Sequence, residues 1–177
     1  MDPLRDFLAI NPEQLLGRLT GGLAKEGFDT TTATTFSWQR EIAEIHEAFR
    51  LLLDLLPAAA RWPVLFEYVL PIVGQRVDCI LLADDVIYVI EYKGGSSARA
   101  HSALQQAQEY ALNLVDFHEV SRHRTAIPIA VGTFKTSIPL DVSSEHQGGA
   151  VSPSELPDTI VRSHIVWGGK GAPIDAR

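Results

Sequence analysis

The sequence predicts an α/β domain in which a helix, three strands, a second helix and a fourth strand follow one another. Three observations support this order. A long amphipathic helical pattern covers residues 38–56, short β-rich apolar runs begin near residue 64, and a second helical pattern at 98–118 precedes an apolar run at 127–134. Strands that are apolar on both faces need helices on both sides. We therefore expect a three-layer αβββαβ core with a central mixed sheet.

Composition bounds the class of protein. The chain has 177 residues, of which 46% are hydrophobic and 21% charged, so it can bury a core and is not disordered. The net charge of −7 argues against a general electrostatic clamp on nucleic acid, and any phosphate chemistry must therefore be local. The single cysteine, Cys79, excludes an intramolecular disulfide framework and fits a reducing compartment. Without a secretory or membrane-spanning pattern, we expect a cytoplasmic protein with no membrane partner.

The chain divides into three regions by pattern. Residues 1–36 are expected to form a helical and linker extension with little chemistry, in which the threonine-rich stretch 30–35 is the linker. Residues 37–135 form the expected core. Residues 136–177 are richer in Ser, Pro and Gly, and we expect one further strand there, at 160–167, together with a linker.

The first core helix carries an informative carboxylate. Ser37 is expected to cap a helix over residues 38–56, which ends before a proline. At 100° per residue, Glu41 falls within the apolar stripe of this helix, whereas Glu44 and Glu47 point away from it. A carboxylate that faces a core needs a partner. Glu41 is therefore a candidate site residue.

Three ionisable residues lie at the ends of the apolar strands 76–82 and 86–92. A two-residue turn at Asp84-Asp85 pairs Asp78 with Glu91 when the register is counted outward. Directly opposed residues stand about 5 Å apart on one face of a sheet. Lys93, two residues beyond Glu91, returns to that same face.

Two carboxylates at that distance repel each other unless one is protonated or a cation lies between them. A hard divalent cation such as Mg²⁺, for which Mn²⁺ can substitute, resolves the conflict with Asp78 and Glu91 as ligands. The main-chain carbonyl of Tyr92 could add a ligand, and Lys93 would position the attacking water. The pattern indicates phosphodiester hydrolysis.

These residues resemble the signature of the PD-(D/E)xK nuclease superfamily: Asp78, a hydrophobic hairpin, then Glu91-Tyr92-Lys93. The resemblance covers about residues 37–134 and includes the αβββαβ order that is typical of that family. This sequence lacks the proline that often precedes the aspartate in that family. The resemblance implies a restriction-endonuclease-like fold and a Mg²⁺-dependent deoxyribonuclease in DNA repair, processing or defence, with RNA a less favoured substrate.

Two further features extend this resemblance. Glu41 matches the helix glutamate that many members place near the metal, where it would act as a ligand or through a water molecule. Gln106 and Tyr110 look like the QxxxY motif of the RecB-like branch, whose residues flank the DNA path. The run Leu65-Phe66-Glu67-Tyr68 before the motif is similar to nuclease-like segments of bacterial helicase-like ATPases. This narrower likeness implies such an ATPase in the same or an associated chain.

Several residues keep two interpretations. Glu67 is either a salt-bridge partner of Arg76 or an outer ligand of the site, and Gln106 with Tyr110 is either an ordinary helix pair or a DNA contact. The one basic cluster is a candidate nucleic-acid contact or simply a set of cations favoured at a helix C-terminus. It consists of His118, Arg122, His123 and Arg124.

Two alternatives to a nuclease remain open from the sequence. The first is a catalytically silent nucleic-acid-binding or assembly module of the same fold, within a larger helicase-like protein. The second is an unrelated α/β protein in which Asp78 and Glu91 are structural.

Overall fold

A computed structural model of the chain describes residues 2–25, 32–70, 74–94, 99–117, 121–122, 124–144, 147–171 and 174. The described helices are α1 (Leu4–Ala9), α2 (Pro12–Lys25), α3 (Thr32–Leu55), the 3₁₀ helix η1 (Pro57–Arg61), α4 (Ala100–Phe117) and α5 (Leu156–Trp167). The described strands are β1 (Asp2–Pro3), β2 (Pro63–Val69), β3 (Arg76–Ala83), β4 (Val86–Lys93), β5 (Thr125–Gly132) and β6 (Gly149–Val151).

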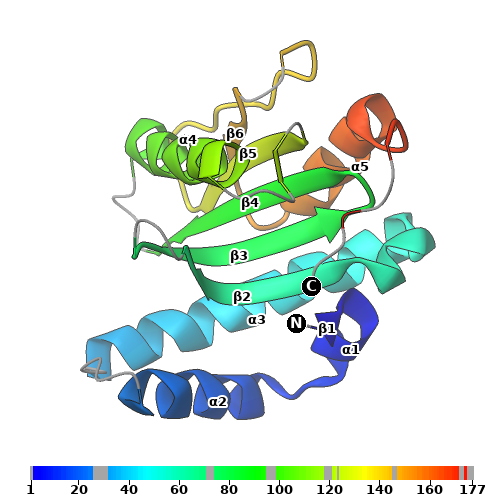
Figure 1. Cartoon of the computed structure of the whole chain (residues 1–177). Coiled ribbons are helices and arrows are strands. Elements are labelled where there is room, and N and C mark those ends of the chain that lie inside the picture. Colours follow the sequence, from blue (N-terminus) through cyan, green and yellow to red (C-terminus); the bar gives the residue numbers. More distant parts are fainter. Residues whose placement is uncertain are drawn as a thin grey trace.

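The described strands form one mixed sheet in the order β1-β2-β3-β4-β5-β6 (Figure 1). Neighbours from β1 to β4 are antiparallel, whereas β5 runs parallel to β4 and β6 parallel to β5. The parallel step is possible because α4 carries the chain back across the sheet between β4 and β5. The expected α/β class with a mixed sheet is confirmed.

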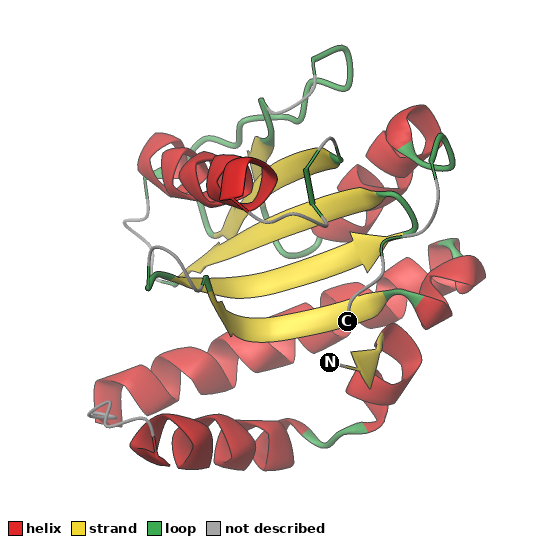
Figure 2. Ribbon diagram, viewed as in Figure 1, coloured by secondary structure: helices red, strands yellow, loops and turns green. Residues whose placement is uncertain are grey.

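Helices cover both faces of this sheet (Figure 2). One core cluster joins α1, α2, α3 and α5 to side chains such as Leu81, Tyr88 and Ile129. A second cluster packs Tyr110, Ala111 and Leu114 of α4 against the other face. Burial of both faces explains why β3 and β4 are apolar at nearly every position. No helix among the described residues is both long and apolar enough to cross a membrane.

The β3–β4 hairpin has the predicted register. Ala83 pairs with Val86 across the turn, and the pairing continues to Cys79 with Ile90. Asp84 has φ 56°, a left-handed conformation that aspartate tolerates better than most residues. The turn also anchors the C-terminal segment, because the Asp85 carboxylate accepts hydrogen bonds from the main-chain N–H groups of residues 169–171.

The strand predicted at 160–167 is wrong, because this segment belongs to α5. Its buried positions include Leu156, Ile160 and Ser163, separated by four and three residues, and Ile165 is 77% exposed. That spacing is helical, and a proline occupies the first turn of α5, where a helix accepts it. The further C-terminal strand is instead the three-residue β6, which is too short to give a periodic signal.

The expected start of the first core helix is also wrong. α3 begins at Thr32, so residues 32–35 are helical rather than linker, and Ser37 lies inside the helix instead of capping it. Residues 30 and 31 lie outside the described part of the chain. α2 lies beside α3 in Figure 1, and the two helices are in contact. Packing of this kind outweighs the weak helix propensity of threonine.

Candidate active site

β3 and β4 separate at Asp78. The paired register ends at Cys79 and Ile90, and the next main-chain donor of β4, the N–H of Tyr92, donates to Asp78 Oδ2 at 2.7 Å. A side-chain oxygen thus takes the place of a carbonyl in the ladder. Asp78 and Glu91 follow this last pair, and the two carboxyl groups are close enough for the charge of Asp78 to raise the pKa of Glu91.

Lys93 completes this group of charges. Its Nζ donates to Glu91 Oε1 at 2.8 Å, with Glu91 almost fully buried and Lys93 about one-third exposed. Asp78, Glu91 and Lys93 therefore lie close together, although the strand pairing stops at Cys79 and Ile90, and their chemical roles stay predictions. Tyr92, between them, buries its ring toward α3.

The helix α3 brings Glu41 to the same place. Glu41 is 4% exposed, whereas Glu47 is exposed to solvent. The helical phase therefore predicted both residues correctly. It was wrong for Glu44, which is half-buried because its carboxylate accepts a hydrogen bond from the Tyr92 hydroxyl while also pairing with Arg40.

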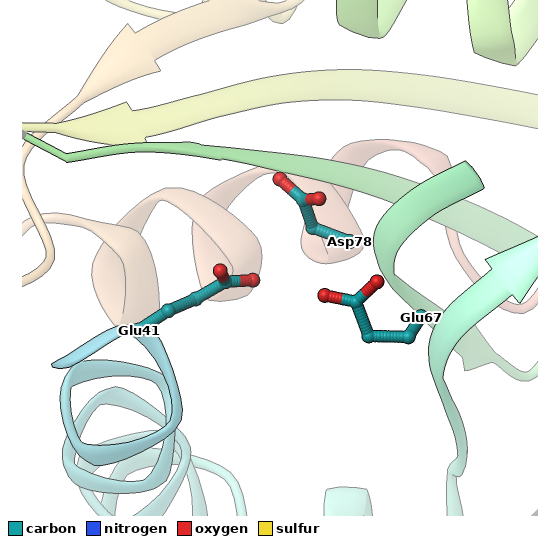
Figure 3. Close-up of side chains that lie close together, drawn as sticks. All are labelled: Glu41, Glu67 and Asp78. Atoms are coloured by element: carbon teal, nitrogen blue, oxygen red, sulfur yellow. The ribbon is translucent and has the colours of Figure 1, made fainter. Parts of the chain in front are cut away.

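Glu67 is a neighbour of the site that the predicted set of site residues omitted. One carboxylate oxygen from each of Glu41, Glu67 and Asp78 lies within 4.8 Å of the others, and Figure 3 shows the three side chains grouped at one place. Glu67 also forms an ion pair with Arg76. The salt-bridge interpretation of Glu67 is therefore confirmed, and its role as an outer ligand stays a prediction. The only signal in the sequence was a glutamate inside an apolar strand.

Burial and mutual repulsion shift the pKa of each carboxyl group upward. Burial, followed by the charges of Asp78, Glu67 and Glu91, raises the pKa of Glu41 to about 10. Burial raises the pKa of Glu67 to about 7 against the opposing effect of Arg76, and burial with Asp78 raises the pKa of Glu91 to about 7. Burial also raises the pKa of Asp78, although the Tyr92 N–H opposes it. The buried position of these four carboxyl groups therefore favours their protonated, neutral form over the negatively charged form.

The residues present fit a divalent cation. Four carboxyl groups face two cationic side chains, Arg76 and Lys93, which leaves two negative charges when every group is ionised. Glu41 Oε1 is buried and has no hydrogen-bond partner. Such an oxygen is costly unless a ligand satisfies it. Hard oxygen donors suit Mg²⁺ and Mn²⁺.

The helix α4 borders the other side of the site. Gln106 donates from Nε2 to the Tyr110 hydroxyl at 2.7 Å, so the two residues form a helix pair. Tyr110 lies close enough to Asp78, Glu91 and Lys93 for their charges to perturb its pKa, which burial raises. An open pocket of about 320 Å³ adjoins this pair. It is lined by Gln75, Ser102, Gln105, Gln106, Glu109 and Tyr110.

Arg122 and Arg124 lie away from the carboxylate group, and their role as nucleic-acid contacts stays a prediction. They lie just before β5, whose first residue, Thr125, pairs with Val86 beside the hairpin turn. Glu91 instead pairs with Ala130, five residues farther along β5. Five strand residues span about 17 Å. The parallel crossover therefore places the two arginines at the opposite end of the sheet, and His118 and His123 lie outside the described residues.

Comparison of the chain with family models, with curated proteins and with solved structures found no match.

Proposed function

We propose that this chain is a metal-dependent nuclease domain that hydrolyses phosphodiester bonds, with DNA as its substrate. The observation that carries the proposal is the convergence of Asp78, Glu91, Lys93 and Glu41 where two strands separate, with a buried oxygen of Glu41 left without a partner. A divalent cation bound here would satisfy that oxygen.

The carboxylates would hold the cation. Asp78 and Glu91 would be its principal ligands, with Glu41 and the main-chain carbonyl of Tyr92 beside them. When bound, Mg²⁺ or Mn²⁺ supplies Lewis-acid polarisation of the phosphate oxygens. The β3–β4 ladder fixes Asp78 through the Tyr92 N–H, so this ligand is held in position before any cation arrives.

Lys93 would act as a donor rather than as a base. Burial lowers its pKa, but the hydrogen bond and charge of Glu91 outweigh that effect and raise it, so the ammonium group stays protonated at neutral pH. A protonated lysine can orient the attacking water by hydrogen bonding and can stabilise charge that develops on the phosphate. It cannot accept the proton of the water.

The DNA would approach over α4. Gln106 and Tyr110 border the carboxylates and line a pocket whose other walls are amide, hydroxyl and carboxylate side chains. Such groups hydrogen-bond to a nucleic acid without adding positive charge. Because the net charge is −7, strong binding would need a partner, for which a helicase-like ATPase in the same or an associated chain is our proposal.

One observation favours a second candidate, a nucleic-acid-binding or assembly module without catalysis. Lys93 and Arg76, the cations that touch the carboxylates, are each already in an ion pair. Lys93 is therefore not available to position an attacking water molecule unless Glu91 is taken up by another cation.

Cleavage of plasmid and linear DNA decides between the two candidates. The wild-type chain and Asp78→Ala are incubated with each substrate in Mg²⁺, in Mn²⁺ and in EDTA. We expect wild type to cut with either metal and to be inert in EDTA, and Asp78→Ala to be inert throughout. Metal-independent DNA binding without cutting would replace the nuclease proposal with the binding module.

A further inference from the structure

Glu67 occupies an unusual position for a strand residue. Its φ is 54°, in the left-handed region that a glutamate rarely adopts and that costs free energy. Its neighbours Leu65 and Tyr68, three residues apart, pack against the same core cluster under α4. Regular alternation would send them to opposite faces, so the side-chain direction of β2 reverses at Glu67.

The same reversal occurs directly opposite, in β3. Val77 and Ile80 are also three residues apart and also pack against the cluster under α4, so β3 reverses near Asp78. The pairs Phe66 with Cys79 and Tyr68 with Val77 flank Glu67 and Asp78, which have no pairing of their own. In both neighbouring strands the alternation of side chains between the two faces of the sheet is therefore interrupted at the same level. A carboxylate residue, Glu67 in β2 and Asp78 in β3, lies at each interruption.

An ion pair with Arg76 does not account for this arrangement. Arg76 is about one-third exposed and stacks over the ring of Trp38, with its guanidinium carbon 5.3 Å from the ring centroid. A surface arginine of this kind could be matched by a carboxylate on an ordinary strand residue. The strained conformation instead buries the Glu67 carboxylate beside Glu41, whose Oε1 has no hydrogen-bond partner, and beside Asp78 (Figure 3).

We propose that Glu67 is a further carboxylate ligand of the divalent cation, beside Glu41 and Asp78, and that Arg76 holds its side chain in place for that purpose. The inference rests on the proposed function only in requiring a cation at this site, and it does not require DNA cleavage. A bound cation would satisfy the unpaired Glu41 oxygen and neutralise the carboxylates that face it.

Calorimetric titration of the full chain with Mn²⁺ tests this proposal. We compare wild type, Glu67→Gln and the matched control Glu47→Gln, which removes an exposed carboxylate of α3. Mn²⁺ affinity should fall at least tenfold in Glu67→Gln and stay unchanged in Glu47→Gln. Wild-type affinity in Glu67→Gln would overturn the inference, as would a wild type that binds no Mn²⁺ at millimolar concentrations.

A second pair of variants covers the case in which Glu67→Gln fails to fold because Arg76 loses its partner. The double variant Glu67→Gln/Arg76→Gln removes both charges of the ion pair, and Arg76→Gln, which keeps Glu67, is its reference. The double variant should bind Mn²⁺ at least tenfold more weakly than Arg76→Gln, and equal affinities would overturn the inference. If these binding results hold while wild type cuts no DNA, the cation ligand stands and the nuclease proposal fails.

Discussion

The Asp78 carboxylate accepts a 2.7 Å hydrogen bond from the main-chain N–H of Tyr92, at the point where β3 and β4 part. Asp78 therefore has two roles. Its carboxylate accepts a hydrogen bond from a main-chain donor of the sheet, and one of its oxygens lies close to the carboxylates of Glu41 and Glu67. The sheet and the candidate metal site therefore depend on one side chain.

Two substitutions of Asp78 separate these roles. Asp78→Asn keeps an oxygen that can accept from Tyr92, whereas Asp78→Ala leaves that N–H without its acceptor, which costs about 1–3 kcal/mol. In metal-free buffer we expect Asp78→Ala to be less stable than Asp78→Asn by that amount, as measured by urea unfolding. Equal stabilities would mean that the hydrogen bond contributes nothing to the fold.

The pH dependence of stability follows from the raised carboxyl pKa values. In the folded state the pKa is about 10 for Glu41 and about 7 for Glu67 and Glu91. These groups therefore hold protons in the folded state that the unfolded chain releases above about pH 4.5. Their contribution to stability is complete below that pH and is lost as the pH rises through the folded values. The melting temperature of metal-free protein should therefore fall between pH 7 and pH 9.

Glu41→Gln provides the control for this prediction, because an amide does not titrate. The variant should show a shallower fall in melting temperature over the same range. His46 does not interfere, since burial followed by the charge of Arg50 lowers its pKa to about 4, below the range tested. A wild type that gains stability from pH 7 to pH 9 would contradict the account of the buried carboxyl groups.

Lys93→Ala should separate cation binding from cleavage. The variant removes a positive charge beside Glu91, so Mn²⁺ affinity should stay level or rise. The cleavage rate at saturating Mn²⁺ should fall at least about 100-fold, because the donor to the water and to the phosphate is gone. Cleavage at the wild-type rate would show that another group positions the water.

The position of α4 predicts where DNA contacts matter. Gln106→Ala should raise the KM for DNA several-fold, because the residue lines the pocket beside the carboxylates. Arg122→Ala should leave KM within about twofold, since Arg122 lies at the opposite end of the sheet. Steady-state cleavage of a labelled duplex measures both values. A larger effect of Arg122→Ala than of Gln106→Ala on KM would indicate that DNA binds at the end of the sheet that carries the β3–β4 turn.

The local hairpin geometry explains how much of the site the sequence could predict. A two-residue turn fixes the β3–β4 register as far as Cys79 and Ile90, which brings Glu91, Lys93 and Asp78 into one neighbourhood, and the Tyr92 N–H then holds the Asp78 side chain. The helical periodicity of α3 also predicted that Glu41 faces the interior at this site. Glu67 could not be found this way, because the longer β2–β3 connection does not fix a register and the positive φ reverses the direction of the side chain.

Other parts of the fold depend on contacts distant in sequence. The apolar, partly β-branched run at 160–167 fits a strand as well as a helix until Leu156 and Pro157 are counted with it. The end of the sheet at which Arg122 and Arg124 lie follows from β5 being parallel to β4. That relationship could have been inferred from the strand–helix–strand order, since such a crossover joins parallel strands.

Calorimetric titration of Mn²⁺ into wild type and into Asp78→Ala tests the central claim, that the buried carboxylates form a cation site, most directly. We expect saturable binding by wild type and none by Asp78→Ala under the same conditions, with both proteins shown to be folded by circular dichroism. A folded wild type that takes up no Mn²⁺, or an Asp78→Ala variant that binds it as tightly as wild type, would contradict the claim.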